Sequence, residues 1–456
     1  MSATLPPQAT PELRLWKIYA KFLVPMIISN ILQALSGTIN NIYIGQMLGV
    51  KAMAAVSAFF PIFFFMISFM IGLGAGAAVL IGQAWGADEP ERVKAIAGTT
   101  IMVGLYVGVV VAVLGGLMTE PLLRAMKTPA DVLDMSIEYS RIMLIAAPGL
   151  FLFLLITSMM RGVGDTTTSL KTLLISTSVS LLLTPAMIQG WGGLPKLGLA
   201  SGAYAAVISM LLALAWTAWF LLKKRHPLAP DASFREHLRI DRAILAKVIG
   251  IGLPTAVAII TMSLSELAVL FLMNHHGSQA TAAYGAVNQV FSYVQFPAIS
   301  IAITASILGA QAIGAGRGHT LGKIAQTGIA MNLILTGFLV LLGYAFSRAV
   351  ISLFITDAAV LEIAQTILHI MLWSLVVFGM GTVLSGLMRA SGTVLVPTLI
   401  TLLSVFAVQI PVAWLLDQRW GLMGVAASYP VAYTVMLILQ ATYYNLVWKK
   451  KPIKRL

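Results

Sequence analysis

Long apolar runs, separated by short polar segments, dominate the chain from one end to the other. Each run holds about 20 residues or more, enough for a helix to cross a hydrocarbon core of about 30 Å. The runs do not alternate between polar and apolar positions as the strands of a membrane barrel do. Helices are therefore expected, because they satisfy their backbone hydrogen bonds internally. We predict twelve spans: 16–45, 54–80, 93–118, 135–160, 170–188, 198–222, 244–273, 280–309, 324–346, 360–388, 394–416 and 421–447.

Composition supports this interpretation. The chain is 59% hydrophobic and 10% charged, with a mean hydropathy of +0.92 over 456 residues. A soluble protein of this length could not cover its surface with so few charged side chains. The predicted fold class is an all-α integral membrane protein whose solvent over most of its length is the lipid bilayer.

Short motifs return in the second half of the chain at a constant spacing. Gly82-Gln83-Ala84 recurs as Ala310-Gln311-Ala312, and Met160-Arg161-Gly162 recurs as Met388-Arg389-Ala390. A duplicated helical bundle is a common way to build a transporter. The repeat predicts two pseudo-symmetric six-helix lobes around a central cleft. We expect the lobes to be residues 1–222 and 244–456, joined by a cytoplasmic linker, 223–243, that forms a loop or a short surface helix.

The net charge of +13 reflects topology and not nucleic-acid binding. Twelve spans place both termini on one side, and most of the 29 Lys and Arg residues fall there, in runs such as 223–247 and 449–455. This asymmetry predicts a multi-pass protein of the bacterial inner (plasma) membrane with both termini in the cytoplasm. The first fifteen residues carry Pro6, Pro7 and Pro11 and lack the apolar core of a secretory signal, so the first span is expected to be an uncleaved anchor.

Glu266 is the candidate coupling residue. It lies near the middle of span 244–273, whereas most ionisable residues fall in loops or near span ends. A carboxylate at the bilayer centre costs about 2.5–3.5 kcal/mol even on a lenient insertion scale. Its retention points to binding of a proton or a cation; a carboxylic acid hydrogen-bonded to a neighbouring helix is the alternative.

Polar side chains also follow one helical face in each of two spans, and such stripes must face protein or water. Interhelical hydrogen bonding would explain them as well as cavity lining does. His369 and Trp373 lie one turn apart, where an aromatic ring could contact a cationic ligand or serve only in packing. The candidate cavity residues are Asn30, Gln33, Asn40, Tyr284, Asn288, Ser292, Gln295, His369 and Trp373.

The chain resembles the multidrug and toxic compound extrusion (MATE) transporters, of the multidrug/oligosaccharidyl-lipid/polysaccharide flippase superfamily. The resemblance covers nearly the whole chain. It is carried by the order and spacing of Asn41-Ile42-Tyr43-Ile44-Gly45, Gly82-Gln83-Ala84-Trp85-Gly86-Ala87 and the run from Met160 to Thr166. It implies an antiporter in which H⁺ or Na⁺ runs inward while an amphipathic, often cationic, drug leaves by alternating access.

The chain departs from the family pattern at its cation sites. One bacterial branch has an aspartate near the end of span one and Asn and Asp partners on span five; Asn40, Ser180 and Thr184 stand there in this chain. The sodium-coupled branch has a glutamate on span seven, matched loosely by Glu266, and an aspartate on span ten, where residues 375–379 are apolar. Glu266, holding H⁺ or Na⁺, is thus the remaining coupling candidate.

Two other functions stay open at this point. A flippase for a lipid-linked oligosaccharide would need deep basic residues for its pyrophosphate, and only Arg141 approaches such a place. A membrane-embedded transferase would need Asp, His or Lys clustered at one membrane face, and we find no such cluster. We therefore expect no catalytic residues, no cofactor besides the coupling ion, no nucleic-acid partner, and a monomer in the bilayer that binds a small amphipathic substrate.

Overall fold

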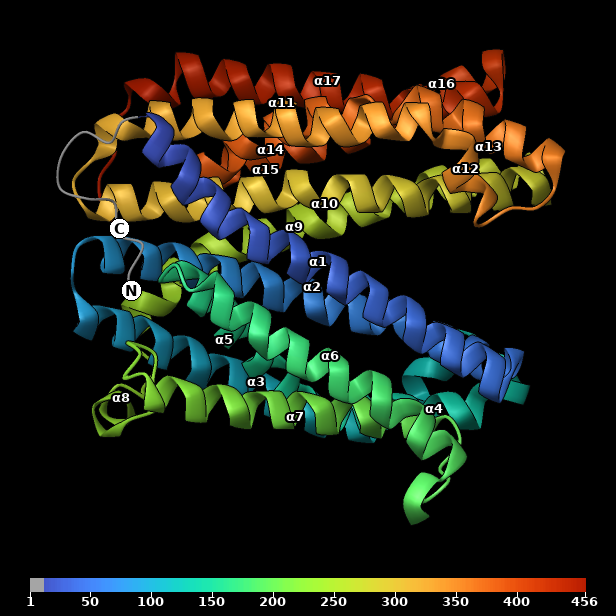
Figure 1. The fold of residues 1–456 in the computed structure, drawn as a ribbon, viewed down its shortest axis with the longest axis horizontal. Coiled ribbons are helices and arrows are strands. Elements are labelled where there is room, and N and C mark those ends of the chain that lie inside the picture. The colour runs from blue at the N-terminus through green and yellow to red at the C-terminus, as the bar shows by residue number, and fades with distance from the viewer. Residues whose placement is uncertain (1–11) are drawn as a thin grey trace. The chain divides into compact units, whose positions relative to one another are not determined.

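The computed structural model describes residues 12–456, so Pro6, Pro7 and Pro11 lie outside the described part (Figure 1). Helices make up the regular structure, and the described residues contain no strand. The first seven helices are α1 (Glu12–Leu48), α2 (Val50–Gly86), α3 (Pro90–Ala125), α4 (Ala130–Ile145), α5 (Ala147–Gly162), α6 (Thr166–Gln189) and α7 (Ala200–Lys223). The rest are α8 (Ala232–Glu236), α9 (Arg242–Asn274), α10 (Ser278–Gly314), α11 (Leu321–Ala345), α12 (Ser347–Ser352), α13 (Ala358–Met371), α14 (Ser374–Ala390), α15 (Leu395–Leu403), the π-helical η3 (Ser404–Gln409), α16 (Ile410–Trp420) and α17 (Leu422–Leu446).

The all-α membrane fold is confirmed. Within the described residues, 11 helices are long and apolar enough to cross a membrane, and a bent pair brings the number to 12. The bent pair is α4 with α5, which meet at an angle of 52° and together cover the predicted fourth span. Pro148 lies in the first turn of α5, where its missing N–H is tolerated and the preceding helix ends.

The described chain forms two compact units that differ in two places from the predicted lobes. One unit contains residues 12–27 and Pro254–Leu456, and the other contains Ile28–Leu253. Helices α1 and α9 are therefore each shared between the units. Pro25 and Pro254 lie close to these two changes, and each removes one backbone hydrogen bond from its helix.

Within the unit of residues 28–253, the first turns of α9 lie very close to α2. A Cβ atom added at Gly252 would come within 2.9 Å of the Gly72 carbonyl oxygen, and one added at Gly76 would collide with the Val248 carbonyl oxygen. Only glycine lets two helix backbones approach this closely. The two glycines therefore fix the start of α9 on α2.

The linker folds onto the same unit, and its short helix α8 agrees with the predicted surface helix. The side chain of Asp231 caps this helix by accepting a hydrogen bond from the Phe234 backbone N–H. Phe234 is buried, and Lys94 Nζ donates to Ser233 Oγ at 2.8 Å. His237 Nε2 lies 3.3 Å from a Glu91 carboxylate oxygen. These contacts attach the linker to the start of α3.

A second histidine holds the start of the linker. His226 Nε2 lies 3.7 Å from an Asp165 carboxylate oxygen, and its Nδ1 accepts a hydrogen bond from the Leu228 backbone N–H at 3.1 Å. Burial lowers the pKa of His226, and the carboxylate of Asp165 opposes this shift. Protonation at Nδ1 would also break the bond from Leu228, so the neutral ring fits this site best.

Candidate functional site

Glu266 lies on α9, at the edge of the helix face that packs into its unit. Thr261, Ser265 and Val269 are buried on that face, whereas the Glu266 side chain is exposed. Its carboxylate makes no hydrogen bond or ion pair with another described residue. A carboxylate without a fixed partner keeps its oxygens free for a proton or a metal cation.

Tyrosine hydroxyls from α10 and α17 lie within electrostatic range of this position. Tyr284 and Tyr429 share a hydrogen bond of 2.8 Å between their hydroxyl oxygens, and both rings are buried. The Glu266 carboxylate is close enough to interact electrostatically with the hydroxyls of Tyr284, Tyr429 and Tyr433. The carboxylate and these tyrosines therefore form one polar cluster, which we call the Glu266 cluster.

Aromatic rings enclose the Glu266 cluster. The Tyr429 ring lies 5.5 Å from Phe291 and 5.8 Å from Tyr433 between ring centroids, and Tyr433 lies 4.9 Å from Phe378. Phe378 belongs to α14 and lies in the apolar segment 375–379, where the sodium-coupled branch carries its aspartate. The faces of aromatic rings attract cations.

The π-helical segment η3 adds an amide to the same region. Ser265 Oγ donates a hydrogen bond of 2.6 Å to Gln409 Oε1, and the Gln409 Nε2 atom is buried without a hydrogen-bond partner. Single π-helical turns are frequent at functional sites because they reorient side chains within a helix. Here the turn places the Gln409 amide next to the residue that precedes Glu266.

A second polar site, a cavity of about 230 Å³, lies in the unit of residues 28–253. Gln33, Ser36 and Asn40 line it from α1, and Ser180 lines it from α6. Asn40 Nδ2 lies 3.5 Å from Ser180 Oγ, and the Asn40 Oδ1 atom is buried with no hydrogen-bond partner. The cavity has amides, hydroxyls and apolar side chains in its lining but no ionisable side chain. We call it the Asn40 cavity.

The other sequence-predicted residues divide between these two units. Thr184 is buried on α6, and Asn30 lies on α1 ahead of the Asn40 cavity. Asn288, Ser292 and Gln295 continue the stripe of α10 and are partly buried, and Ser292 Oγ donates to the Asn288 carbonyl.

His369 and Trp373 lie at the junction of α13 and α14. His369 Nε2 lies 3.0 Å from Ser347 Oγ, and its carbonyl accepts a hydrogen bond from the Tyr344 hydroxyl. Trp373 is 43% exposed. The contacts of His369 join α11, α12 and α13, which gives it a packing role in the structure.

The sequence did not single out Tyr429, Tyr433 or Gln409. The two tyrosines lie one turn apart on the last span, and Gln409 precedes Pro411 in the middle of span eleven. A polar residue at mid-span was the available signal for all three. Within the described residues, no group of three or more His, Asp or Glu side chains could hold a metal ion. A Na⁺ ion at Glu266 would therefore draw its other ligands from hydroxyl, amide and carbonyl oxygens.

Comparison with known proteins identifies the chain. The family model MatE matches it twice, over residues 25–186 and 254–415. The chain belongs to the MatE family. It is thus a member of the multidrug and toxic compound extrusion transporters, and the two matches repeat the internal duplication seen in the sequence. The resemblance inferred from the motifs is confirmed, and so is the prediction that the chain is a transporter and not an enzyme.

Relatives and solved structures agree with this assignment. The chain is 45% identical to the probable multidrug resistance protein YoeA of Bacillus subtilis, over 97% of this chain and 96% of that protein. It is 25% identical to the probable multidrug resistance protein NorM of Thermotoga maritima, over 92% and 89%. A Vibrio cholerae MATE transporter structure shares its fold with a TM-score of 0.89 at 21% identity, over 97% and 99% of the two chains.

Proposed function

We propose that the chain is a cation-coupled antiporter that exports amphipathic, often cationic, compounds by alternating access. The observation that carries the coupling part is the Glu266 carboxylate, which has no fixed partner and stands beside the Tyr284–Tyr429 hydroxyl pair. The names of its relatives, multidrug resistance and multidrug export proteins, support the kind of substrate.

The Glu266 cluster suits exchange of a cation for a cationic drug. An acid in the membrane is costly when ionised and alone, so it is stabilised by a bound proton, a bound Na⁺ or a positively charged ligand. Binding of a proton, a Na⁺ ion or a cationic ligand at Glu266 therefore competes with binding of the other two. Coupling follows if the ion and the drug bind the two access states with different affinities.

The Asn40 cavity contributes differently under this proposal. Its amides and hydroxyls offer hydrogen bonds without a charge, and Leu150, Phe153 and Met210 offer apolar contacts. Such a lining accommodates the uncharged parts of many solutes.

Efflux from proteoliposomes tests the proposal, with pH and sodium gradients imposed separately. The wild-type chain should export a cationic dye such as ethidium under one of the two gradients, and Glu266→Gln should abolish the gradient dependence. Glu362→Gln is the matched control, because Glu362 is an exposed acid on α13. Undiminished gradient-driven efflux by Glu266→Gln would remove Glu266 from the mechanism.

We further propose that the protein works as a monomer in the bacterial plasma membrane with both termini in the cytoplasm. The chain contains no cysteine, so single cysteines can report sidedness directly. Lys451→Cys should react with an impermeant maleimide only after the cells are opened, whereas Lys51→Cys should react in intact cells. The opposite pattern would reverse the topology.

A further inference from the structure

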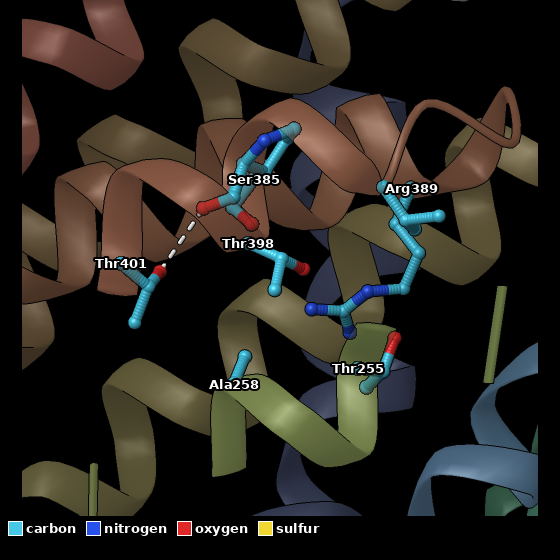
Figure 2. A pocket seen from close by; sticks show the side chains of 8 residues that line it. Thr255, Ala258, Ser385, Arg389, Thr398 and Thr401 are labelled. Atoms are coloured by element: carbon cyan, nitrogen blue, oxygen red, sulfur yellow. Dashed lines mark hydrogen bonds between the residues drawn. The ribbon is translucent and has the colours of Figure 1, made fainter. Parts of the chain in front are cut away.

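A small cavity beside Arg389 lies away from the Glu266 cluster and plays no part in the proposed coupling. Its volume is about 20 Å³, and side chains of α9, α14 and α15 enclose it. Figure 2 shows the Arg389 guanidinium extending into the space between Thr255, Ala258 and Thr398. All of the lining residues belong to one compact unit, that of residues 12–27 and Pro254–Leu456.

Among the described residues, no acidic side chain forms an ion pair with Arg389. It is partly buried, and its guanidinium makes no ion pair or hydrogen bond with another described residue. Its counterpart in the first repeat, Arg161, donates to Ser158 Oγ at 2.9 Å. A guanidinium keeps its proton in proteins and carries five N–H donors that require acceptors. The cavity therefore holds a positive charge that has no acceptor in the part of the chain that the structure describes.

The hydroxyl groups around Arg389 carry no negative charge that could balance its guanidinium. Thr398 Oγ1 donates to the Pro254 carbonyl at 3.2 Å, and Thr401 Oγ1 donates to the Pro397 carbonyl at 3.1 Å. The Ser385 hydroxyl makes no hydrogen bond with another described residue, so its proton is available to a ligand. Among the described residues that line the cavity, the Arg389 N–H groups and the Ser385 O–H are therefore the donors that an anion could use.

The start of α15 adds to the positive potential. Val394, the N-cap residue, borders the cavity and offers no side-chain cap. The first N–H groups of a helix have no partner inside the helix, and the helix dipole is positive at this end. Arg389 and this helix end thus act together on the same small volume.

We propose that this cavity binds a single monatomic anion of the size of chloride. A cavity needs about 10–15 Å³ of space open to the centre of a water-sized sphere to hold one such particle. The space of about 20 Å³ therefore has room for one particle about as large as a water molecule or a halide ion. A water molecule would fill the space but would leave the guanidinium without a counter-charge, which is costly where water is scarce.

The bound anion would join α14 to the start of α15. Thr398 is already tied to the carbonyl of Pro254, the residue at which α9 passes from one compact unit to the other. An anion held by Arg389, by Ser385 and by the first N–H groups of α15 would fasten α14 to α15, the helix that carries Thr398. Its predicted effect is stabilisation of this end of the unit, independent of the transported substrate and of Glu266.

Bromide serves as the probe, because it replaces chloride and scatters anomalously. Crystals of the full-length protein grown in sodium bromide should show an anomalous peak beside the Arg389 guanidinium. The purified protein should also melt at a temperature that rises with sodium chloride or bromide, relative to sodium gluconate at equal ionic strength. Arg389→Gln should weaken this anion effect by roughly tenfold or more, since it removes a charge-assisted hydrogen bond.

Arg161→Gln is the matched control and should keep the halide effect. Ser385→Ala provides a second test if Arg389→Gln fails to fold, because it removes one hydrogen-bond donor and retains the positive charge. It should lower the anion affinity by several-fold, which corresponds to the loss of one hydrogen bond. An ordered water without bromide density would overturn the proposal. A halide effect that is the same in the wild type and in both variants of the cavity would overturn it as well.

Discussion

Removing one hydroxyl from the Tyr284–Tyr429 pair should destabilise the protein more than removing both. The two hydroxyl oxygens are 2.8 Å apart and both residues are 2% exposed, so neither hydroxyl is well placed to turn to water. In Tyr429→Phe the Tyr284 hydroxyl stays buried and loses its partner, at a cost of about 1–3 kcal/mol. The double variant Tyr284→Phe/Tyr429→Phe leaves no unpaired hydroxyl and should lie near the wild type.

A double-mutant cycle on purified protein measures this coupling. Unfolding in mixed detergent micelles gives a free energy for each of the four chains. Because each single variant loses about 1–3 kcal/mol and the double variant almost nothing, the interaction energy should be about 2–6 kcal/mol. The ring packing of Tyr429 on Phe291 is retained in all of them. Strictly additive losses would show that the two hydroxyls do not depend on each other, and would refute the buried pair as the centre of the Glu266 cluster.

Two further predictions concern the unit of residues 28–253. Gly76→Ala should lower the melting temperature, because its methyl group would press on the Val248 carbonyl; overpacking of this kind costs about 1–3 kcal/mol. Gly250→Ala, where the new methyl meets no atom within 4 Å, should be neutral, and equal melting of the two would contradict the close contact of α2 with α9. The linker should loosen in acid. Burial lowers the pKa of His226 in the folded state, so the unfolded segment takes up the proton more readily. The stability of the folded linker is therefore complete above about pH 6.5 and falls below it. Hydrogen exchange of residues 226–237 should therefore speed up on acidification, less so in His226→Asn, and pH-independent exchange would contradict this.

Hydropathy predicted the helices well because the bilayer imposes one length and one polarity on every span. The bend between α4 and α5 could also be predicted from the sequence, since Pro148 marks the break. The sharing of α1 and α9 between the two units could not be predicted from the sequence. A repeat shows which segments correspond to each other, but it does not show which segments pack together. The contact of Gly76 with Val248 is of this long-range kind.

The candidate site was predicted in part for a similar reason. Glu266 stood out because a charge is rare at mid-span, whereas Tyr429 and Tyr433 look like ordinary aromatic residues of a membrane helix. Their relation to Glu266 depends on how α17 packs beside α9 and α10. Gln409 faces Ser265 from a π-helical turn, and the hydrophobic pattern contains no sign of that turn.

The most direct test of coupling through Glu266 is the efflux rate of Glu266→Gln in proteoliposomes under a proton gradient alone and under a sodium gradient alone. The account predicts that the wild type responds to one of these gradients and that the variant responds to neither, while Glu362→Gln behaves as the wild type. Gradient-driven efflux by Glu266→Gln at the wild-type rate would contradict it.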